Sequence, residues 1–231
     1  MIPTFSRSPI HPEGLIFALF SGILTVLLWY VFTPFGVAGL LITLWVLAFF
    51  RNPQRVVPQI DGAIVSPADG TICAITPNVS APEGTDLPGK EWTRVCVFMD
   101  VFNVHVNRMP ISGEVTYSAH KPGKFFDARL DKASTDNEQQ IIVVEDKKAK
   151  LTIPFVQVAG LIARRIRCDA KKGQKVSIGE VFGLIRFGSR VDVYLPSGIE
   201  PQVIKGQTII AGETILANAV TQLPQPKGIE R

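Results

Sequence analysis

A glycine–serine step, Gly188-Ser189, is the first feature of the sequence that could do chemistry. It lies in a short turn between two apolar runs that we expect to be strands, residues 181–186 and 191–194. Such a turn can be strained, and because Gly188 has no side chain, the Ser189 hydroxyl can approach the preceding carbonyl carbon. Gly-Ser is also among the commonest turn dipeptides. Taken alone, the step leaves nucleophilic chemistry and an ordinary turn both open.

Acid–base groups that could assist a serine are few. The chain has three histidines, His11, His105 and His120, and histidine is the side chain that changes charge near neutral pH. His11 precedes the apolar N-terminal segment, which makes it the poorest candidate. A lone histidine such as His105 is structural more often than catalytic, and Asp69, in the turn at residues 66–70, can serve the turn alone. Both residues are therefore candidates with an ordinary alternative.

The composition argues against several classes of protein. Cys73, Cys96 and Cys168 lack Cys-x-x-Cys spacing, which argues against a disulfide framework and a zinc site, so we expect no metal. No dense Lys/Arg tract interleaved with aromatic residues is present, so we expect no nucleic-acid partner. The formal net charge of +4 fits work against an anionic lipid surface, and a slightly basic solvated surface would account for it as well.

The N-terminal region predicts a membrane anchor. Residues 14–50 contain no Asp, Glu, Lys, Arg or His and divide at residues 33–36, Thr-Pro-Phe-Gly. Residues 14–32 come close to the ~20 apolar residues that span a bilayer, whereas residues 37–50 are shorter. Pro and Gly favour a tight reversal between the two parts. We therefore expect a helical hairpin with its linker, residues 1–56, that either spans the membrane twice or dips into one leaflet.

Flanking charges set the orientation of this hairpin. Both forms leave Arg7 and the pair Arg51 and Arg55 on one side, which the positive-inside rule makes the cytoplasmic side of the cell membrane. Two alternatives exist. A cleaved signal peptide would need a shorter apolar core and a small-x-small site, which residues 48–51 do not provide. A helix pair buried in a globular core is rarely apolar on all faces.

The remainder, residues 57–231, predicts a β-rich catalytic domain. Short runs rich in Val and Ile alternate with Gly, Pro and Asp turns, and helix signals are weak, so the expected fold class is β-dominated (α+β). A long loop is expected at residues 121–134, and such loops are often functional. Besides the two beside the Gly-Ser step, the expected strands are residues 71–75, 94–99, 113–117, 140–145 and 150–158.

The C-terminal third contains an internal repeat. Residues 172–180 and, 33 positions later, residues 205–213 share the pattern Lys-Gly-Gln-x-(Val/Ile)-x-x-Gly-Glu. Each copy predicts a Gly turn, a short strand, a second Gly turn and another strand. Two such copies resemble the lipoyl/biotinyl-like barrel-sandwich domain, an architecture that alone says nothing about chemistry. Between the copies lies the Gly-Ser step, in place of a lysine motif that would carry lipoate or biotin.

Five motifs, taken in order, resemble those of the phosphatidylserine decarboxylases, in particular their short bacterial and archaeal form. An apolar N-terminus ends in Phe-Arg-Asn-Pro, and Ser-Pro-Ala-Asp-Gly follows at residues 66–70. The His105 segment at residues 102–110 comes next, then Pro-Gly-Lys-Phe at 122–125 with Asn-Glu after it, and Phe-Gly-Ser-Arg at 187–190. Each motif is weak by itself, but the ordered set covers nearly the whole chain and is specific.

The resemblance implies a proenzyme that makes its own cofactor. Ser189 attacks the Gly188 carbonyl, and β-elimination splits the chain into a large chain ending at Gly188 and a small chain that begins with a pyruvoyl group. The amine of phosphatidylserine forms a Schiff base with this ketone, which takes up the electrons left by CO2. Reprotonation and hydrolysis give phosphatidylethanolamine. The implied partners are an anionic phospholipid membrane and the two associated chains, and a homo-oligomer is left open.

The resemblance also implies roles for single residues. His105 matches the histidine that does acid–base work in decarboxylation, and Asp69 matches the aspartate linked to self-cleavage. The longer relatives carry a second histidine three residues after the first, as the base for the serine. Here this residue is Arg108, which stays protonated and cannot be a base. The base for Ser189 is then either His105 working with Asp69 or, as second choice, His120.

Two residues of the cleavage motif also depart from the longer relatives. Phe187 replaces a leucine and Arg190 replaces a threonine. An arginine next to the cofactor can meet the carboxylate or phosphate of the substrate. It can equally point to solvent or pair with a nearby aspartate.

Two other functions compete with the enzyme. A membrane-tethered, non-catalytic barrel-sandwich adaptor or carrier would explain the hairpin and the repeat, but it would leave Gly188-Ser189 and His105 as coincidence. A zinc peptidase would need several His and Asp ligands, and His105 and His120 do not have recognisable ligand spacing. The decarboxylase accounts for more of the sequence than either alternative.

Overall fold

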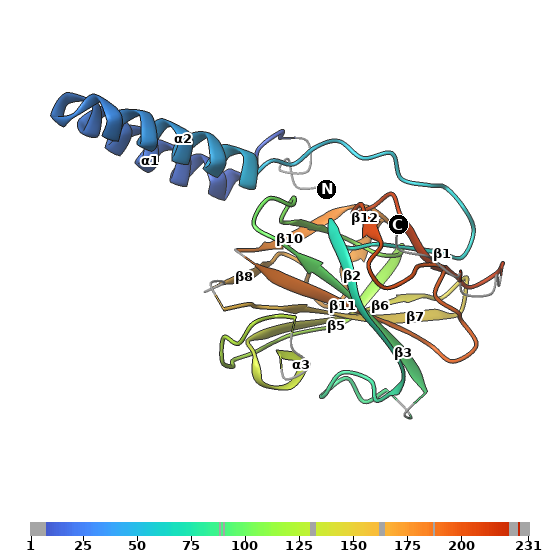
Figure 1. Ribbon diagram of the computed structural model, residues 1–231. Helices are drawn as coiled ribbons and strands as arrows, with labels where there is room; N and C mark the ends of the chain where they lie inside the picture. Colours follow the sequence, from blue (N-terminus) through green and yellow to red (C-terminus); the bar gives the residue numbers. More distant parts are fainter. Residues whose placement is uncertain are drawn as a thin grey trace.

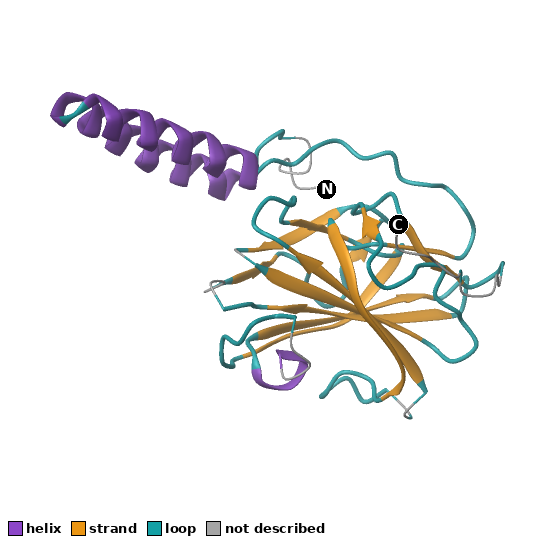
Figure 2. Ribbon diagram, viewed as in Figure 1, coloured by secondary structure: helices purple, strands orange, loops and turns teal. Residues whose placement is uncertain are grey.

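The computed structural model describes residues 8–87, 89, 91–129, 133–161, 165–186, 188–221 and 226. It consists of a pair of helices and a β-rich body, and the pair projects away from the body (Figure 1 and Figure 2). The predicted combination of an apolar helix pair with a β-rich body is confirmed. Arg7 and Phe187, which entered the interpretation of the sequence, lie outside the described residues.

The helix pair reverses at Phe32, between α1 (Pro12–Val31) and α2 (Thr33–Phe49). The predicted break at residues 33–36 is therefore wrong by a few positions. Pro34 lies in the first turn of α2, where its missing N–H leaves no intrahelical bond unmade. Gly36 lies within α2, and a Cβ there would overlap the Trp29 ring of α1. This glycine thus allows close helix packing and does not form the turn.

Small and hydroxyl side chains join the two helices, and apolar side chains cover their outside. The Thr25 and Thr43 hydroxyls form a 3.0 Å hydrogen bond between α1 and α2. Of the helices in the described ranges, α1 alone is long and apolar enough to cross a membrane, and α2 is apolar but shorter. Most outward side chains of the pair are exposed. The alternative of a helix pair buried in a globular core is therefore wrong.

The base of the hairpin is fastened to the body by an ion-pair cluster and by packing. Glu13, in the first turn of α1, accepts hydrogen bonds from Arg167 at 3.2 Å and Arg186 at 2.7 Å. Phe49 and Phe50, at the end of α2, pack against Leu184 of the body. The end of the hairpin is therefore part of the packed structure and is not a free tether.

Thirteen strands make up the described part of the body, most of them in one large antiparallel sheet. This sheet has the order β12-β2-β3-β11-β7-β6-β5-β9, and β4-β10-β8 and β1-β13 form two smaller sheets. Every strand predicted from the sequence is confirmed, with ends shifted by at most a few residues. The strands are β1 (Ala63–Val65), β2 (Gly70–Val79), β3 (Trp92–Met99), β4 (Val106–Arg108), β5 (Gly113–Lys121), β6 (Gln139–Asp146), β7 (Leu151–Val158), β8 (Ile166–Cys168), β9 (Lys175–Val176), β10 (Val181–Ile185), β11 (Ser189–Leu195), β12 (Thr208–Ile209) and β13 (Ile215–Asn218). The predicted long loop contains one helical turn, α3 (Ala133–Asp136).

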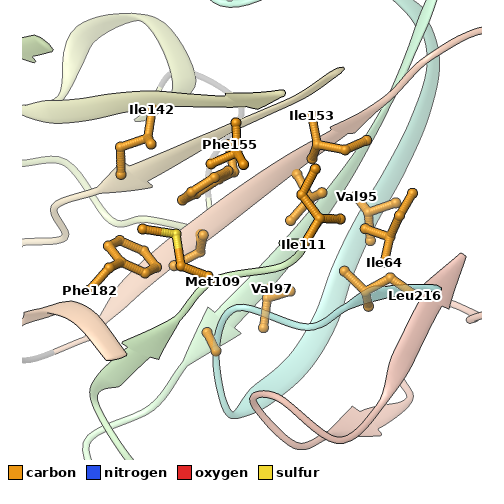
Figure 3. Packing of buried hydrophobic residues seen from close by; sticks show 14 of the residues in the cluster. Ile64, Val95, Val97, Met109, Ile111, Ile142, Ile153, Phe155, Phe182 and Leu216 are labelled. Atoms are coloured by element: carbon orange, nitrogen blue, oxygen red, sulfur yellow. The ribbon is translucent and has the colours of Figure 1, made fainter. Parts of the chain in front are cut away.

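The large sheet and the two small sheets enclose one apolar core, part of which Figure 3 shows from close by. Val95 and Val97 of β3 and Phe155 of β7 face Phe182 of β10 and Leu216 of β13, all of them buried. Alternate side chains of the central strands point into this core, as the period of a β-strand requires. The body is thus a curled half-barrel of β-sheet, and a lipoyl-like barrel sandwich is not confirmed.

The two sequence repeats adopt the same local structure. Gly173 and Gly206 have φ of 84° and 88°, and each precedes a two-residue strand, β9 or β12. Gly179 and Gly212, both with φ of 76°, end these strands, and β10 or β13 follows. The predicted order of Gly turn, strand, Gly turn and strand is therefore confirmed in both copies.

Candidate active site

Ser189 begins β11 in the interior of the body. It pairs with Met99 of β3, its side chain is fully buried, and its Oγ has no hydrogen-bond partner among the described residues. Gly188 before it has φ of 58°, a conformation that other residues adopt rarely. A buried hydroxyl without a partner costs about 1–3 kcal/mol. Its presence here indicates chemistry more than stability.

The Gly188 carbonyl is packed against a second glycine, Gly160. A Cβ at Gly160 would overlap the carbonyl oxygen of Gly188, so only glycine allows this approach. Gly160 follows β7, the strand that pairs with β11 on the side opposite β3. Gly160, just after β7, therefore lies directly against the carbonyl that Ser189 would attack. Sequence reasoning did not single out Gly160.

Asn137 of the fourth motif supports this glycine. Its buried side chain donates to Ala159 O at 2.7 Å and to Phe126 O at 2.8 Å, and its Oδ1 accepts from Phe126 N at 2.9 Å. Ala159 N donates in turn to Glu138 O at 3.0 Å. The motif thus fixes the backbone directly before Gly160.

His105 lies in the loop before β4 and is buried under the hairpin. Its ring stacks on that of Phe49 in α2, with centroids 4.0 Å apart and planes at 28°. Nδ1 lies 3.0 Å from Asn103 O, which can only accept, so Nδ1 carries a proton and Nε2 keeps a lone pair. Nε2 has no partner in the described part of the chain. Burial lowers the pKa of His105 to about 4, so the ring is neutral at pH 7.

Strand pairing brings His105 and Ser189 to one region of the body. β4 pairs with β10, where Leu184 opposes Val106, and Ile185 N donates to His105 O at 3.4 Å. β10 ends at Ile185, and β11 begins four residues later, at Ser189. Ile185, four residues before Ser189, is thus a backbone partner of His105.

Asp69 has both carboxylate oxygens bonded elsewhere. Oδ2 accepts from Arg55 at 2.7 Å, and Oδ1 accepts from Ala211 N at 2.8 Å. Asp69 directly precedes β2, which is separated from β11 by β3, and two strand spacings amount to about 10 Å. Within the described residues Asp69 therefore connects the linker to the second repeat, and its carboxylate is not bonded to His105.

Arg108, in place of a second histidine, faces the linker that follows the hairpin. Its guanidinium donates to Asn52 Oδ1 at 2.7 Å, to Pro53 O at 2.9 Å and to Gly179 O at 3.0 Å. Burial lowers the pKa of Arg108 to about 10, which still leaves it charged at pH 7. Arg108 thus fastens the chain between hairpin and body, a role in which its permanent charge is useful.

Arg190, next to Ser189, forms a buried ion pair on the opposite face of β11. It donates to the two carboxylate oxygens of Asp192 at 2.7 and 2.9 Å, to Ala128 O at 2.6 Å, and to the Ser134 hydroxyl. Burial alone would lower the pKa of Arg190, but the Asp192 charge raises it overall. Of the predicted alternatives, pairing with a nearby aspartate is confirmed.

His120, the second candidate base, lies on β5 with 49% of its side chain exposed, and its Nε2 contacts Glu138 at 3.1 Å. β5 is separated from β11 by β6 and β7, and three strand spacings amount to about 14 Å. The geometry therefore favours His105 over His120 as a neighbour of Ser189.

Two buried amides that the sequence did not single out complete the site. Gln157 of β7 lies on the same inner face as Ser189, and its Nε2 donates to Asn107 Oδ1 at 2.8 Å. Its Oε1 has no partner among the described residues. Ser189 Oγ, His105 Nε2 and Gln157 Oε1 are thus three buried, unpaired polar atoms contributed by β11, the loop before β4, and β7. Such a cluster is typical of an active site and not of a folding core.

Comparison with known proteins agrees with this geometry. Residues 42–217 match the family model of phosphatidylserine decarboxylase. The chain is 50% identical to the phosphatidylserine decarboxylase proenzyme of Ruegeria pomeroyi, over 94% of this chain and 98% of that protein. It is 48% identical to the proenzyme of the same name from Cereibacter sphaeroides, over 100% of this chain and 98% of that protein. These likenesses support the enzyme and not the adaptor, and the chain belongs to the phosphatidylserine decarboxylase family.

Proposed function

We propose that the chain is a precursor that cleaves itself between Gly188 and Ser189 and then converts phosphatidylserine to phosphatidylethanolamine and CO2. The observation that carries the proposal is the unpaired, buried Ser189 hydroxyl beside a Gly188 carbonyl held against Gly160. Oγ bonds to the carbonyl carbon and the peptide C–N bond breaks, which gives an ester. Elimination releases the Gly188 carboxylate and leaves dehydroalanine. Water then replaces its nitrogen, which leaves as ammonia, and a pyruvoyl ketone remains.

His105 takes the proton from Ser189 in this scheme. Its Nε2 is a buried acceptor without a partner among the described residues, and its pKa of about 4 keeps it neutral at pH 7. A pKa this low also makes the ring a weak base. The attack then depends on the placement of hydroxyl and carbonyl more than on base strength. Asp69 acts by holding Arg55 and the backbone of Ala211, which fixes the strand next to β3.

The residues present fit a pyruvoyl group at position 189. The group would derive from Ser189 itself and lie in a buried site where His105 and Gln157 offer polar atoms that have no partner in the described chain. Such a ketone would supply the carbonyl that binds the substrate amine and takes up the electrons left by CO2. His105 would hold the proton that returns to the carbon losing CO2.

The hairpin is proposed to hold the enzyme on an anionic phospholipid membrane, with the body on the cytoplasmic side. The length of α1, the exposed apolar side chains of both helices, and Arg51 and Arg55 after α2 support this arrangement. Residues 1–56 would be the anchor with its linker, and residues 57–231 the catalytic domain. The equal turns of the two repeats support a barrel-sandwich-like relation between them. The scheme is the same for one copy or a homo-oligomer.

After cleavage the large chain, ending at Gly188, and the small chain, starting at residue 189, would stay associated. Support comes from β11, which begins at the cleavage point and pairs with β3 on one side and β7 on the other. Most of the small chain's apolar side chains in β11 are part of the common core. Separation of the two chains would therefore expose that core to water.

Intact mass of the purified protein, wild type beside Ser189→Ala, tests the proposal. We expect the wild type to give two chains divided between residues 188 and 189, with the small chain blocked by pyruvoyl, and the variant to stay whole. Decarboxylation of phosphatidylserine in mixed micelles should then follow cleavage. A single, unmodified wild-type chain from a folded preparation would sink the mechanism.

A further inference from the structure

We propose that Gln157 binds the amino group of the substrate through its carbonyl oxygen Oε1, and that Asn107 fixes the direction of this oxygen. The inference rests on the proposed function and deepens it. It assigns to the buried site a hydrogen-bond acceptor for a primary amine. In the proposed function, this amine reacts with the carbonyl formed from Ser189.

Strand register places Gln157 beside Ser189. Val191 of β11 opposes Gln157 of β7, and Ser189 lies two residues before Val191, so the side chains of all three share one face of the sheet. Diagonal neighbours on antiparallel strands have backbones about 7–8 Å apart, which a glutamine side chain can bridge. Both side chains are fully buried.

The orientation of the Gln157 amide follows from its partners. Asn107 Nδ2 lies 3.6 Å from Met99 Sδ, and a thioether can only accept, so Asn107 turns its Oδ1 the other way. That oxygen accepts from Gln157 Nε2 at 2.8 Å. Gln157 Oε1 is thereby turned away from Asn107, and it has no partner among the described residues.

Because Gln157 Oε1 can only accept a hydrogen bond, it favours a ligand that donates one. A buried amide oxygen without a partner is unfavourable, so a ligand that brings an N–H recovers the lost hydrogen bond on binding. A ketone at position 189 carries no N–H, whereas the amine that attacks it does. If the amine is charged, the hydrogen bond is stronger still. The amide pair therefore fits an amine-headed substrate and disfavours one whose headgroup ends in an apolar group.

A neighbouring glutamine supplies a matched control. Gln140 of β6 opposes Gln157 directly and is also buried, but it lies one strand further from Ser189. Its Nε2 donates to Ser118 Oγ at 3.1 Å. Gln157→Met and Gln140→Met therefore remove the same amide from the same sheet face, and only the first faces the reacting centre.

The test follows capture of a soluble amine by the processed enzyme. Wild type, Gln157→Met and Gln140→Met are incubated with ethanolamine and cyanoborohydride, which reduces the captured amine to a stable secondary amine on the small chain. Intact mass then reports both cleavage and capture. We expect all three proteins to be cleaved, capture to be at least about tenfold slower in Gln157→Met, and Gln140→Met to match wild type. With phosphatidylserine in mixed micelles, Gln157→Met should raise KM more than it lowers kcat.

Asn107 is tested as a positioning residue by a pair of variants. Asn107→Asp keeps an acceptor for Gln157 Nε2 and should capture ethanolamine within about threefold of the wild-type rate, whereas Asn107→Leu should approach Gln157→Met. Equal rates for the Asp and Leu variants would overturn this part.

The remaining outcomes separate the inference from the function beneath it. Unchanged capture by Gln157→Met would overturn the amine-binding role alone. A Gln157→Met precursor that stays uncut would also overturn it, because the residue would then act in processing. An uncut wild type would overturn the proposed function and this inference together.

Discussion

The hairpin and the β-rich body bury opposite kinds of atoms. The hairpin turns its apolar side chains outward, and between its helices the buried Thr25 and the half-buried Thr43 bond to each other through their hydroxyls. The body buries its apolar side chains inside, yet beside Ser189 it holds polar atoms that have no partner in the described chain. The hairpin thus pairs polar groups between its helices and exposes apolar atoms, whereas the body leaves buried polar atoms without a partner among the described residues. The two meet where Phe49 stacks on His105.

The largest expected effect is confined to the body. Gly160→Ala would place a Cβ on the Gly188 carbonyl oxygen and move the scissile bond. Because misplacement by about 1 Å can cost 10²-fold, self-cleavage should slow by at least about 100-fold. A time course of intact mass after expression measures the rate. Gly173→Ala adds a Cβ that meets no neighbour but strains a turn with φ of 84°, so it controls for a general loss of stability in the body. Equal cleavage rates would show that the approach to Gly188 is not needed.

The next effect concerns stability of the body against acid. Burial lowers the pKa of His105 to about 4, from 6.5 in the unfolded chain, so between these values the unfolded state binds more protons. The neutral ring therefore favours folding fully above pH 6.5, and this advantage is lost as pH falls toward 4. By pH 5 the loss is about 2 kcal/mol. His105→Gln in the uncut Ser189→Ala background should lack this loss.

Urea unfolding in detergent at pH 7.5 and pH 5 measures this difference. His120→Gln in the same background is the control, because that histidine is half exposed and pairs only with Glu138 in the described structure. If His105→Gln and the control lose equal stability on acidification, the burial of His105 does not set the pH dependence.

The third prediction tests the junction between the two regions. Phe49→Ala would let water reach His105, and since burial is the main cause of its low pKa, the pKa should rise toward 6.5. The other charges that act on the ring, Asp100, which raises its pKa, and Arg51, which lowers it, stay in place. At pH 5 most of the variant's histidine would then be protonated, and self-cleavage should be about tenfold slower than at pH 8. The wild type should change little over this range.

Intact-mass time courses at the two pH values check this prediction. Phe49→Tyr keeps an aromatic ring on His105 and should restore the wild-type profile. Phe17→Ala removes a ring that stacks on Phe50 and not on His105, which makes it the matched hairpin control. An unchanged profile in Phe49→Ala would mean that the hairpin does not form part of the site.

The elements could be predicted from the sequence more completely than the site. Val/Ile runs between Gly turns report strands because burial and turn geometry are local, and the glycines of both repeats adopt positive φ as such turns require. The observed helix break differs from the predicted one because proline, which breaks a helix interior, is favoured in the first turn of a helix, where Pro34 lies.

The contacts of the site depend on residues far apart in the chain. Phe49 reaches His105, and Arg108 reaches Asn52, across more than fifty positions, and no local pattern reports such pairs. One feature could have indicated a role for Gln157: it is a polar residue in a strand whose side chains are buried on both faces. Ser189 and His105 were found because the order of motifs, and not their local pattern, is specific.

The smallest expected effect is confined to the hairpin. Thr25→Val keeps the shape of the side chain and removes the hydrogen bond to Thr43, which can still donate to Gly39 O at 3.0 Å. Hydrogen bonds between membrane helices contribute about 0.6 kcal/mol on average, so thermal unfolding of the helices in detergent should shift only slightly. Self-cleavage and amine capture should stay at wild-type rates, because the pair lies along the helices, away from the end that packs on the body. A tenfold loss of cleavage in Thr25→Val would contradict the independence of the two regions. Packing between the helices would then affect His105 through contacts other than the one with Phe49.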